Sequence, residues 1–254
     1  MLSIVLIGTG NVAQQFYEAM GNKKGIKIIQ VIGRNKKKLS PFANCPETST
    51  NFKTISDADI YIIAVNDDSI STVSQHIINK SGLVVHTSGS MPLSVLADSV
   101  RRGVFYPLQT ISKERKIDFS EVPICIEAET NEDYELLRKL ANTISNQVQT
   151  MTSEQRKSAH LAAVFVNNFT NHLYHIGNEI CDEAGIPFKI LNPLIIETAK
   201  KATQDNILNA QTGPAIRNDK LTMKKHLALL NNKDYRDIYS VLSNSIRKTY
   251  EKKL

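Results

Sequence analysis

An apolar run at residues 3–7 leads directly into the turn Gly8-Thr9-Gly10-Asn11-Val12-Ala13. A continuous apolar run that ends at glycine is typical of a buried parallel strand, and the spacing GxGxxA directly after it is the pattern of a dinucleotide-binding turn. In that pattern Gly8 permits the tight turn, Gly10 lets the backbone approach a pyrophosphate, and Ala13 lets the following helix pack closely on the strand. The alternative is an ordinary glycine turn between a strand and a helix.

The residues after the turn predict an amphipathic helix that begins near Asn11. Val12, Phe16, Ala19 and Met20 recur at helical spacing and fall on one face. The exposed amides and the dipole at the start of such a helix favour phosphate groups, so we expect it to point at the cofactor. The turn therefore supplies five predicted cofactor-binding residues: Gly8, Thr9, Gly10, Asn11 and Val12.

The end of the second predicted strand indicates which dinucleotide is bound. That strand covers residues 26–32, and an NAD enzyme places an acidic residue at its end to bind the ribose hydroxyls. The chain has Gly33-Arg34-Asn35 there instead. Arg34 offers a planar fork for a 2′-phosphate and Asn35 a neutral hydrogen-bonding side chain, so we predict that NADP is the cofactor and that both residues bind it. We expect the lysines at 36–38 to form a solvated loop.

Further apolar runs predict a sheet in which strands alternate with helices. The runs lie at residues 59–65, 83–86, 103–106 and 122–128, with a helix expected from about residue 69 and another around Pro92. This alternation predicts a parallel sheet with helices on both faces, in which ligands bind at the carboxyl ends of the strands. We predict that five residues at those ends also contact the cofactor: Val65, Asn66, Asp67, Thr87 and Ser88.

Helical periodicity takes over near residue 150. Ser153 is expected to cap a long helix that runs to about Ala184, and Gly185-Ile186-Pro187 to end it. Further helices are predicted at 188–203, 220–231 and 234–251. We therefore predict an α/β protein with a doubly wound, mostly parallel Rossmann sheet at residues 1–152, which binds NADP, followed by an all-helical C-terminal domain at 153–254.

The composition argues against several classes of protein. The 254 residues are 41% hydrophobic, enough for two modest cores. Cys45, Cys125 and Cys181 are far apart, which argues against a disulfide framework and against a zinc site. Basic residues are spread along the chain despite a net charge of +6, so we expect no nucleic-acid partner. No apolar run is long enough to span a bilayer and no charged region precedes the first apolar run, so we expect neither a membrane span nor a signal peptide. The cysteine usage predicts a reducing, cytoplasmic setting.

The motifs together resemble those of a family of Rossmann-like NADP or deazaflavin-dependent oxidoreductases with a C-terminal helical domain of unknown function. The resemblance spans nearly the whole chain, and its pieces are GTGNVA at 8–13, GRN at 33–35, AVNDD at 64–68, HTSGS at 86–90, YPLQT at 106–110, HLAAVFVNN at 160–168 and TGPAIR at 212–217. The domain order is also similar to that of pyrroline-5-carboxylate reductase, ketopantoate reductase and the 6-phosphogluconate dehydrogenase superfamily. Their helical domains build the substrate site and usually a dimer, so the resemblance implies a homodimer formed through the helical domain.

The chain departs from these enzymes at two positions. The segment 160–168 resembles the ketopantoate reductase helix that carries a catalytic lysine, but His160 stands in place of that lysine. Asn168 keeps an asparagine at a matching position. Asn218 stands where the family favours glycine, and because asparagine tolerates a left-handed backbone we expect the turn to be retained.

Three residues are predicted to act in catalysis: His160, Asn168 and Ser88. Hydride transfer needs a group that donates a proton or a hydrogen bond to the substrate atom that gains negative charge. The imidazole of His160 is suited to this role because imidazoles titrate near neutral pH. At α-helical spacing Asn168 lies near the same face as His160. The alternatives are a packed helix histidine for His160, an interface asparagine for Asn168 and a helix-capping loop for Ser88. Tyr106 is either a core aromatic residue at the sheet end or a wall of the nicotinamide pocket.

No metal site is expected. His172, His175 and Glu179 lie at positions i, i+3 and i+7 of one predicted helix, a spacing that resembles a metal clamp. Zinc sites usually recruit further ligands, however, and exposed or interface histidines are common.

The sequence thus predicts an NADP-dependent oxidoreductase that transfers hydride between nicotinamide and a small carbonyl or imine substrate. Two other functions stay open. The missing lysine favours a non-catalytic NADP(H)-binding sensor or scaffold protein, and the family resemblance allows hydride exchange between NADP and a deazaflavin.

Overall fold

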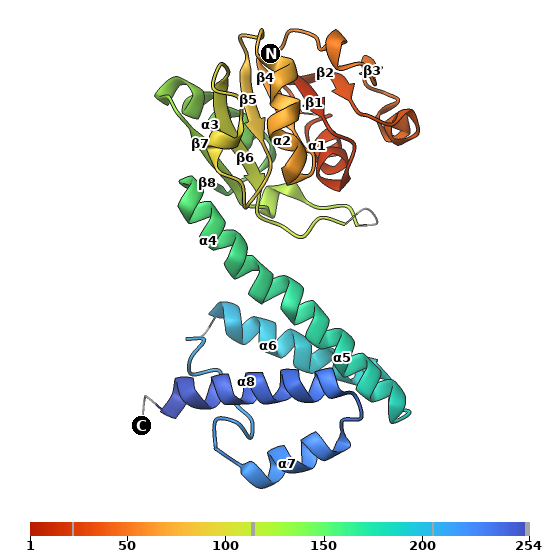
Figure 1. The fold of residues 1–254 in the computed structure, drawn as a ribbon, viewed down its shortest axis with the longest axis vertical. Helices are drawn as coiled ribbons and strands as arrows, with labels where there is room; N and C mark the ends of the chain where they lie inside the picture. Colours follow the sequence, from red (N-terminus) through yellow and green to blue (C-terminus); the bar gives the residue numbers. More distant parts are fainter. Residues whose placement is uncertain (22, 113–114, 205, 252–254) are drawn as a thin grey trace. The chain divides into compact units, whose positions relative to one another are not determined.

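The structure, a computed structural model, describes residues 1–21, 23–112, 115–204 and 206–251 (Figure 1). The chain forms two compact units, Met1–Asn167 and Asn168–Leu254. The expected boundary between functional domains at residue 152 stays a prediction. Residues 252–254 of the predicted helical domain lie outside the described residues.

Within the described residues, the first unit contains one eight-stranded sheet. Its strands are β1 (Leu2–Ile7), β2 (Ile26–Ile32), β3 (Glu47–Ser49), β4 (Ile60–Ile63), β5 (Leu83–His86), β6 (Arg101–Pro107), β7 (Ile124–Ala128) and β8 (Val148–Thr150). They follow the order β3-β2-β1-β4-β5-β6-β7-β8, in which the β6–β7 pair is antiparallel and the other pairs are parallel. This arrangement confirms the predicted mostly parallel, doubly wound sheet.

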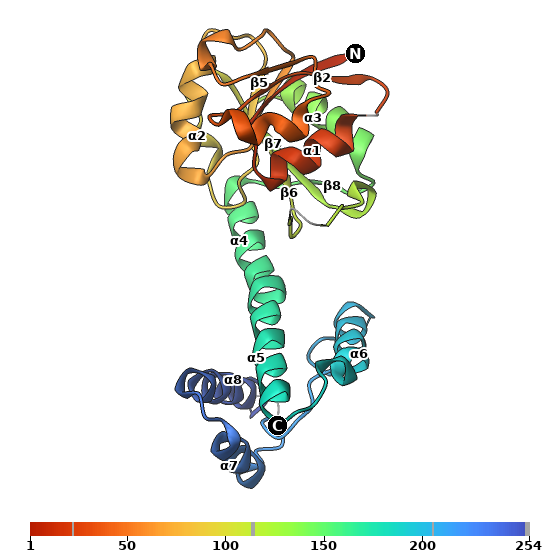
Figure 2. The same ribbon diagram turned by 90° about the vertical axis from the view of Figure 1, so that its right-hand side faces the viewer.

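Both faces of the sheet are buried, as continuous apolar strands predict. Three helices pack on it: α1 (Asn11–Gly21), α2 (Asp67–Ser74) and α3 (Asn131–Ile144). In β1, Ile4 and Leu6 belong to the core that includes residues of α1 and α3. Val5 and Ile7 belong to a second core that includes residues of α2. Figure 2 shows α1 and α3 on one face of the sheet and α2 on the other.

Some local predictions for the first unit need correction. The sequence does not predict β3, because three polar residues carry no apolar periodicity. The helix expected around Pro92 is a single 3-10 turn, Leu93–Val95, with Pro92 as its N-cap. α2 begins at Asp67, ahead of the predicted start, because Asn66 takes the N-cap position.

The helical stretch after residue 152 starts with a different cap from the predicted one. Thr152 is the N-cap of α4 (Ser153–Ala163) and forms a capping box with Gln155. Ser153 is the first helical residue, and its hydroxyl donates a hydrogen bond to Glu127 at 2.9 Å. The pattern Thr-x-x-Gln is the sequence signal that identifies the true cap.

The predicted long helix does not stay α-helical. Val164–Phe169 form a π-helix between α4 and α5 (Thr170–Glu183). A π-helix has a different period from an α-helix, so the α-helical spacing that relates Asn168 to His160 does not hold across this segment. α5 ends before Gly185, whose φ is 69°, as the sequence predicts.

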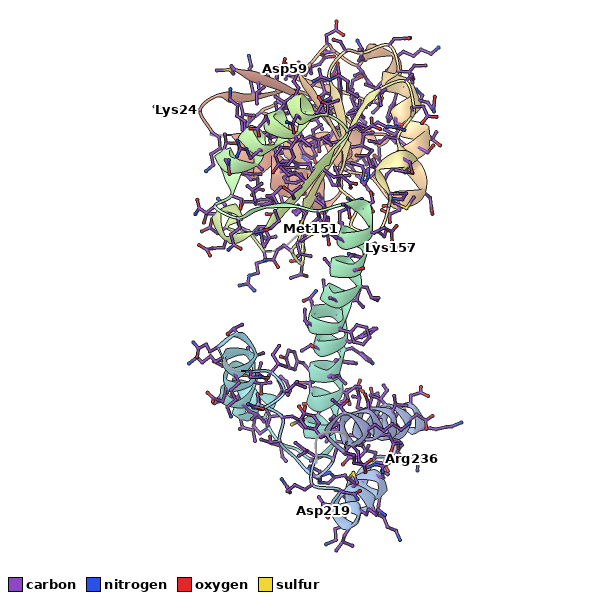
Figure 3. The ribbon with its side chains drawn as sticks, turned by 90° about the vertical axis from the view of Figure 1, so that its left-hand side faces the viewer. Lys24, Asp59, Met151, Lys157, Asp219 and Arg236 are labelled. Atoms are coloured by element: carbon purple, nitrogen blue, oxygen red, sulfur yellow. The ribbon has the colours of Figure 1, made fainter. Side chains whose placement is uncertain are left out.

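The second unit confirms the predicted helical C-terminal region. After α5 come the 3-10 turn Phe188–Leu191, α6 (Asn192–Gln204), α7 (Lys220–Leu229) and α8 (Lys233–Glu251). Asp219, labelled in Figure 3, caps α7 by accepting a hydrogen bond from the N–H of Thr222 at 3.0 Å. Asn218 before it has a φ of 51°, which is the predicted left-handed turn. No helix in the described parts of the chain has the length and apolar composition needed to cross a membrane.

Candidate functional site

A cavity of about 1080 Å³ lies at the carboxyl end of the sheet, where the strand order reverses between β1 and β4. Parallel sheets bind their ligands at such a switch point. Ten of the predicted cofactor-binding residues line the cavity: Gly8, Thr9, Gly10, Asn11, Val12, Arg34, Asn35, Val65, Asn66 and Thr87. The residues that the sequence selects from four separate segments are therefore brought together in one place.

The turn after β1 fits a pyrophosphate. Gly8 has a φ of 131°, and a Cβ there would lie 2.0 Å from the carbonyl oxygen of Ala64, so glycine lets β1 and β4 approach this closely. A Cβ on Gly10 would meet no protein atom within 4 Å. Among the described residues, none accepts a hydrogen bond from the N–H groups of Asn11 and Val12 at the start of α1. These amides and the helix dipole suit a phosphate.

The loop after β2 brings positive charge to the same cavity. Arg34 and Lys38 are exposed and line it, and neither forms an ion pair with a residue that the structure describes. Asn35 caps the 3-10 helix Lys36–Phe42 by accepting a hydrogen bond from the N–H of Lys37 at 2.9 Å, so its side-chain oxygen is engaged. Residues 36–38 are exposed as the sequence predicts, but they belong to this 3-10 helix and not to a loop, and Lys38 also lines the cavity.

Two aromatic rings on the cavity wall carry no signal in the sequence. The ring centroids of Phe52 and His76 are 5.0 Å apart, and both residues line the cavity. Phe52 belongs to a 3-10 turn, and His76 to the 3-10 turn after α2, where no periodic pattern marks either residue. Flat rings of this kind offer a surface on which a planar base can stack.

Asp67 and Ser88 do not line the cavity, although the sequence predicts that both contact the cofactor. Asp67 accepts a hydrogen bond from the hydroxyl of Ser90. The hydroxyl oxygen of Ser88 accepts hydrogen bonds from the N–H groups of Ser90 at 3.2 Å and Met91 at 3.1 Å. Both side chains are thus engaged in the turn after β5, which favours the capping-loop alternative for Ser88. A role for either in binding or catalysis stays a prediction.

His160 lies beside this same turn. Its Nδ1 is 3.1 Å from the hydroxyl of Tyr106 in β6, and both residues are partly exposed. The pair packs against Gly89, because a Cβ on that glycine would lie 2.7 Å from His160 Nδ1 and 2.7 Å from Tyr106 Cζ. Thr87, which lines the cavity, stands two residues before Gly89 in the chain. His160 and Tyr106 therefore pack against the turn that follows the cavity-lining Thr87, although neither of them lines the cavity itself.

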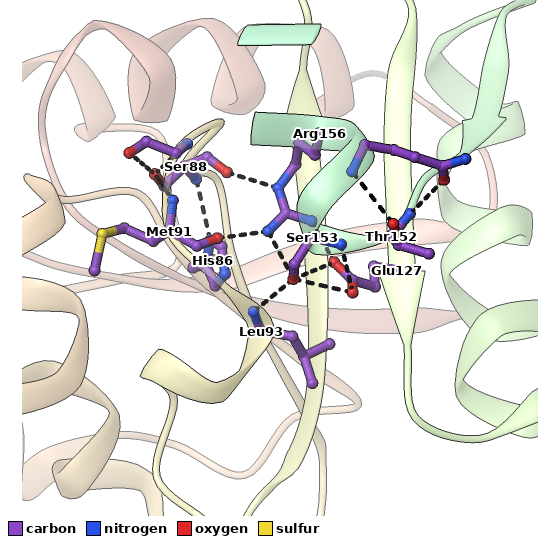
Figure 4. A network of polar contacts seen from close by, with 10 residues as sticks. His86, Ser88, Met91, Leu93, Glu127, Thr152, Ser153 and Arg156 are labelled. Carbon is purple, nitrogen blue, oxygen red and sulfur yellow. Dashed lines mark hydrogen bonds and ion pairs between the residues drawn. The ribbon is translucent and has the colours of Figure 1, made fainter. Parts of the chain in front are cut away.

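A buried arginine ties the turn after β5 to α4 (Figure 4). Arg156 precedes His160 by one helical turn and is 1% exposed. Its guanidinium forms an ion pair with Glu127 of β7 and donates hydrogen bonds to the backbone carbonyls of Ser88, at 3.2 Å, and Met91. The sequence gives no sign of this role, because all three partners are distant in the chain.

His86 is a neutral histidine beneath this network. Its Nδ1 accepts a hydrogen bond from the N–H of Ser88 at 3.2 Å, and its Nε2 has no partner with hydrogen-bond geometry among the described residues. Burial and then the charge of Arg156 lower the pKa of His86 to about 4, and the nearby carbonyl of Pro92 opposes that shift only in part. The ring is therefore uncharged at pH 7.

Tyr106 and the neighbouring Cys125 stay protonated for the same reason. Burial raises the pKa of Tyr106 to about 12, with a further rise from Cys125. Burial also raises the pKa of the Cys125 thiol to about 11. The positive charge of Arg156 opposes both shifts, since it favours the anionic form of each group. At pH 7, Tyr106 is a phenol that can donate a proton.

The remaining predicted residues belong to the second unit. Asn168 lies in the π-helix, and its catalytic role stays a prediction. The ring centroids of His172 and His175 are 6.1 Å apart, and His175 Nε2 is 3.3 Å from Glu179. The described residues nevertheless contain no cluster of three or more His, Cys, Asp or Glu side chains that could hold a metal ion. The Glu179 carboxylate accepts a hydrogen bond from the hydroxyl of Tyr235 instead.

Two family models match the chain. The model described as NADP oxidoreductase, coenzyme F420-dependent, matches residues 3–89. A domain of unknown function, DUF2520, matches residues 122–246. A comparison with curated proteins found no match.

Solved structures extend the similarity to nearly the whole chain. An imine reductase from Myxococcus stipitatus in complex with NADP+ has 14% sequence identity and a TM-score of 0.65, covering 98% of this chain and 93% of that one. A reductive aminase from Aspergillus terreus in complex with NADPH and ethyl levulinate has 13% identity and a TM-score of 0.69, covering 98% and 94%. These two share the fold.

A third structure is much more similar. It is a protein from Bacteroides fragilis, provisionally assigned as an NADP oxidoreductase, with 41% identity and a TM-score of 0.89 over 97% of this chain and 98% of that one. The present chain belongs to the same family, the NADP oxidoreductases in which a dinucleotide-binding domain precedes a DUF2520 domain.

Proposed function

We propose that this protein is an NADP-dependent oxidoreductase that transfers hydride between nicotinamide and a small carbonyl or imine substrate. The observation that carries the proposal is the His160–Tyr106 pair packed on Gly89, just beyond the cavity-lining Thr87. A dinucleotide that lies along the turn after β1 extends toward the ends of β4 and β5. Tyr106 and His160 do not line the cavity themselves, but their contact with the turn that follows Thr87 supports a role for the pair as the proton donor beside the nicotinamide.

The cofactor and the protein supply different parts of the proposed reaction. When bound, the reduced nicotinamide supplies the hydride, and the protein must orient the substrate and supply a proton. The turn after β1 holds the phosphates through backbone amides, and the side chains beside Gly89 offer an imidazole and a phenol to the substrate. The imine reductase and the reductive aminase share the fold, which supports a carbonyl or imine as the substrate class.

NADP is proposed in preference to NAD because of Arg34. Its guanidinium lines the cavity and pairs with no carboxylate of the residues that the structure describes, which favours its binding to a 2′-phosphate. We expect Arg34→Ala to weaken NADPH binding by roughly 10- to 100-fold, since a charge-assisted hydrogen bond contributes about 1.5–3 kcal/mol. NADH binding should change less than twofold. Isothermal titration calorimetry with both cofactors measures the difference.

Lys37→Ala is the matched control for Arg34→Ala. Lys37 belongs to the same loop and is also exposed, but it does not line the cavity. It should leave both affinities nearly unchanged. Equal binding of NADH and NADPH by the unchanged protein, with no loss on Arg34→Ala, would show that the cofactor is assigned wrongly.

Turnover distinguishes the proposed reaction from its alternatives. We expect the purified protein to oxidise NADPH, followed at 340 nm, when small cyclic imines and ketones are added. Tight NADPH binding with no turnover across such a panel would contradict the proposal and favour a sensor or scaffold protein. Reduction of a deazaflavin alone would favour the third function. The family model whose description mentions coenzyme F420 matches only residues 3–89. That match covers the proposed dinucleotide-binding part and says nothing about a site for a deazaflavin.

A homodimer through the second unit is also proposed. Among its described residues, only Ile176, Cys181 and Ala215 are buried apolar residues. Large apolar side chains are exposed instead, with Leu194 at 63% and Leu229 at 76%. Apolar surface of this extent marks an interface in many proteins.

The three buried free cysteines fit the reducing cytoplasm that we propose as the setting of this protein.

A further inference from the structure

Tyr106 and His160 form a hydrogen-bonded pair whose two side chains come from different elements of the fold. Tyr106 comes from β6, and the chain after that strand reaches the cavity at Ile111. His160 comes from α4, and its Nδ1 is occupied by the Tyr106 hydroxyl at 3.1 Å. Gly89 lies against both, and the lack of a side chain there leaves room for the pair.

We propose that the Tyr106 hydroxyl is the proton donor of the reaction and that His160 positions it and returns its proton. This inference rests on the proposed function. Tyrosine is suited to the task because a phenol both donates a proton and accepts a hydrogen bond. His160 is partly exposed, so it can exchange protons with water.

The step balances in atoms and electrons. With the reduced nicotinamide bound, its hydride would form the new C–H bond at the substrate carbon as the π bond to nitrogen or oxygen breaks. Its electron pair takes the proton from the Tyr106 hydroxyl, which forms an N–H or O–H bond and leaves a phenolate. His160 then gives its Nδ1 proton to the phenolate while its Nε2 takes a proton from solvent, so the imidazole stays neutral and the reaction consumes one solvent proton in total.

The surroundings support this direction of proton transfer. Burial raises the pKa of Tyr106, so the phenol holds its proton near pH 7 and has one to give when negative charge develops on the substrate. The charged and titratable groups around it are Arg156 and His160 on α4 and Cys125 on β7. The thiol of Cys125 stays neutral, whereas Arg156 carries a positive charge that stabilises the phenolate after the proton has left.

Tyr106→Phe tests the proposal, because it removes only the hydroxyl. We expect kcat for the reduction of an imine by NADPH to fall at least 100-fold, with the dissociation constant of NADPH unchanged within twofold. Tyr134→Phe is the matched control. The Tyr134 hydroxyl contacts the Thr150 hydroxyl at 2.6 Å in the same unit, and its loss should leave kcat unchanged. Turnover that Tyr106→Phe retains in full would overturn the role of Tyr106 and leave the proposed function standing.

A second variant covers the case in which Tyr106→Phe folds poorly. A fluorinated tyrosine inserted at position 106 keeps the shape and lowers the pKa of the phenol. The alkaline limit of the kcat profile should then move to lower pH, and a profile that does not move would contradict the proposal. Absence of turnover by the unchanged protein would overturn the proposed function, and this assignment with it.

Discussion

Gly8→Ala is expected to destabilise the protein by roughly 3 kcal/mol or more and to abolish dinucleotide binding. The added Cβ would lie 2.0 Å from the carbonyl oxygen of Ala64, so β1 and β4 would have to separate. The φ of 131° at Gly8 adds backbone strain for any residue with a side chain. Urea denaturation followed by circular dichroism measures the free energy of unfolding, and calorimetric titration measures the loss of NADPH binding.

Two other glycines separate folding from binding. A Cβ on Gly10 meets no protein atom within 4 Å, so Gly10→Ala should fold normally and lose affinity only for the pyrophosphate. Gly21, at the end of α1, also has open space around it, and Gly21→Ala should affect neither property. Normal stability and binding in Gly8→Ala would contradict the account of this turn.

Arg156→Met is expected to lower the free energy of unfolding by about 3–5 kcal/mol. Arg156 is 1% exposed, and its removal leaves the Glu127 carboxylate and the carbonyls of Ser88 and Met91 without their donors. Neutralising the carboxylate as well, in Arg156→Met/Glu127→Gln, should recover part of the loss, because an unpaired charge then no longer remains. Urea denaturation of both variants measures this.

Arg138→Met is the matched control for Arg156→Met. Arg138 pairs with Glu135 on the surface of α3, where both side chains are about half exposed. Exposed ion pairs contribute roughly 0–1 kcal/mol, so this variant should lie close to the unchanged protein. A loss in Arg156→Met no larger than that in Arg138→Met would show that the buried network does not hold the turn after β5.

The dinucleotide-binding part of the candidate site can be predicted from the sequence because its motifs consist of residues close together in the chain. β1 and β2 are mostly apolar runs, and the turn at Gly8 and Gly10 stands between a strand and an amphipathic helix. The motif is recognised from residues that are close together in the chain, even though Gly8 also lets β1 approach Ala64. Arg34 can be predicted in the same way, because it stands at the end of β2 where an NAD enzyme has an acidic residue.

The sequence singles out His160 and Tyr106 as candidates, but the contacts of the second group of residues could not be predicted in the same way. Tyr106, Gly89 and His160 meet only because β6, the turn after β5 and α4 converge in the folded first unit. Arg156 has an ordinary helical context in the sequence, and only its burial shows that it is structural. The π-helix at Val164–Phe169 also escapes prediction, since its residues have the same apolar character as an α-helix.

Transfer of deuterium from NADPH labelled at the nicotinamide C4 position tests the central claim most directly. The protein is incubated with the labelled cofactor and a small cyclic imine, and the product is examined by nuclear magnetic resonance. The account predicts one deuterium on the carbon that was double-bonded to nitrogen, at a rate that Tyr106→Phe lowers at least 100-fold. Bound NADPH that keeps its deuterium in the presence of every carbonyl and imine substrate would contradict it.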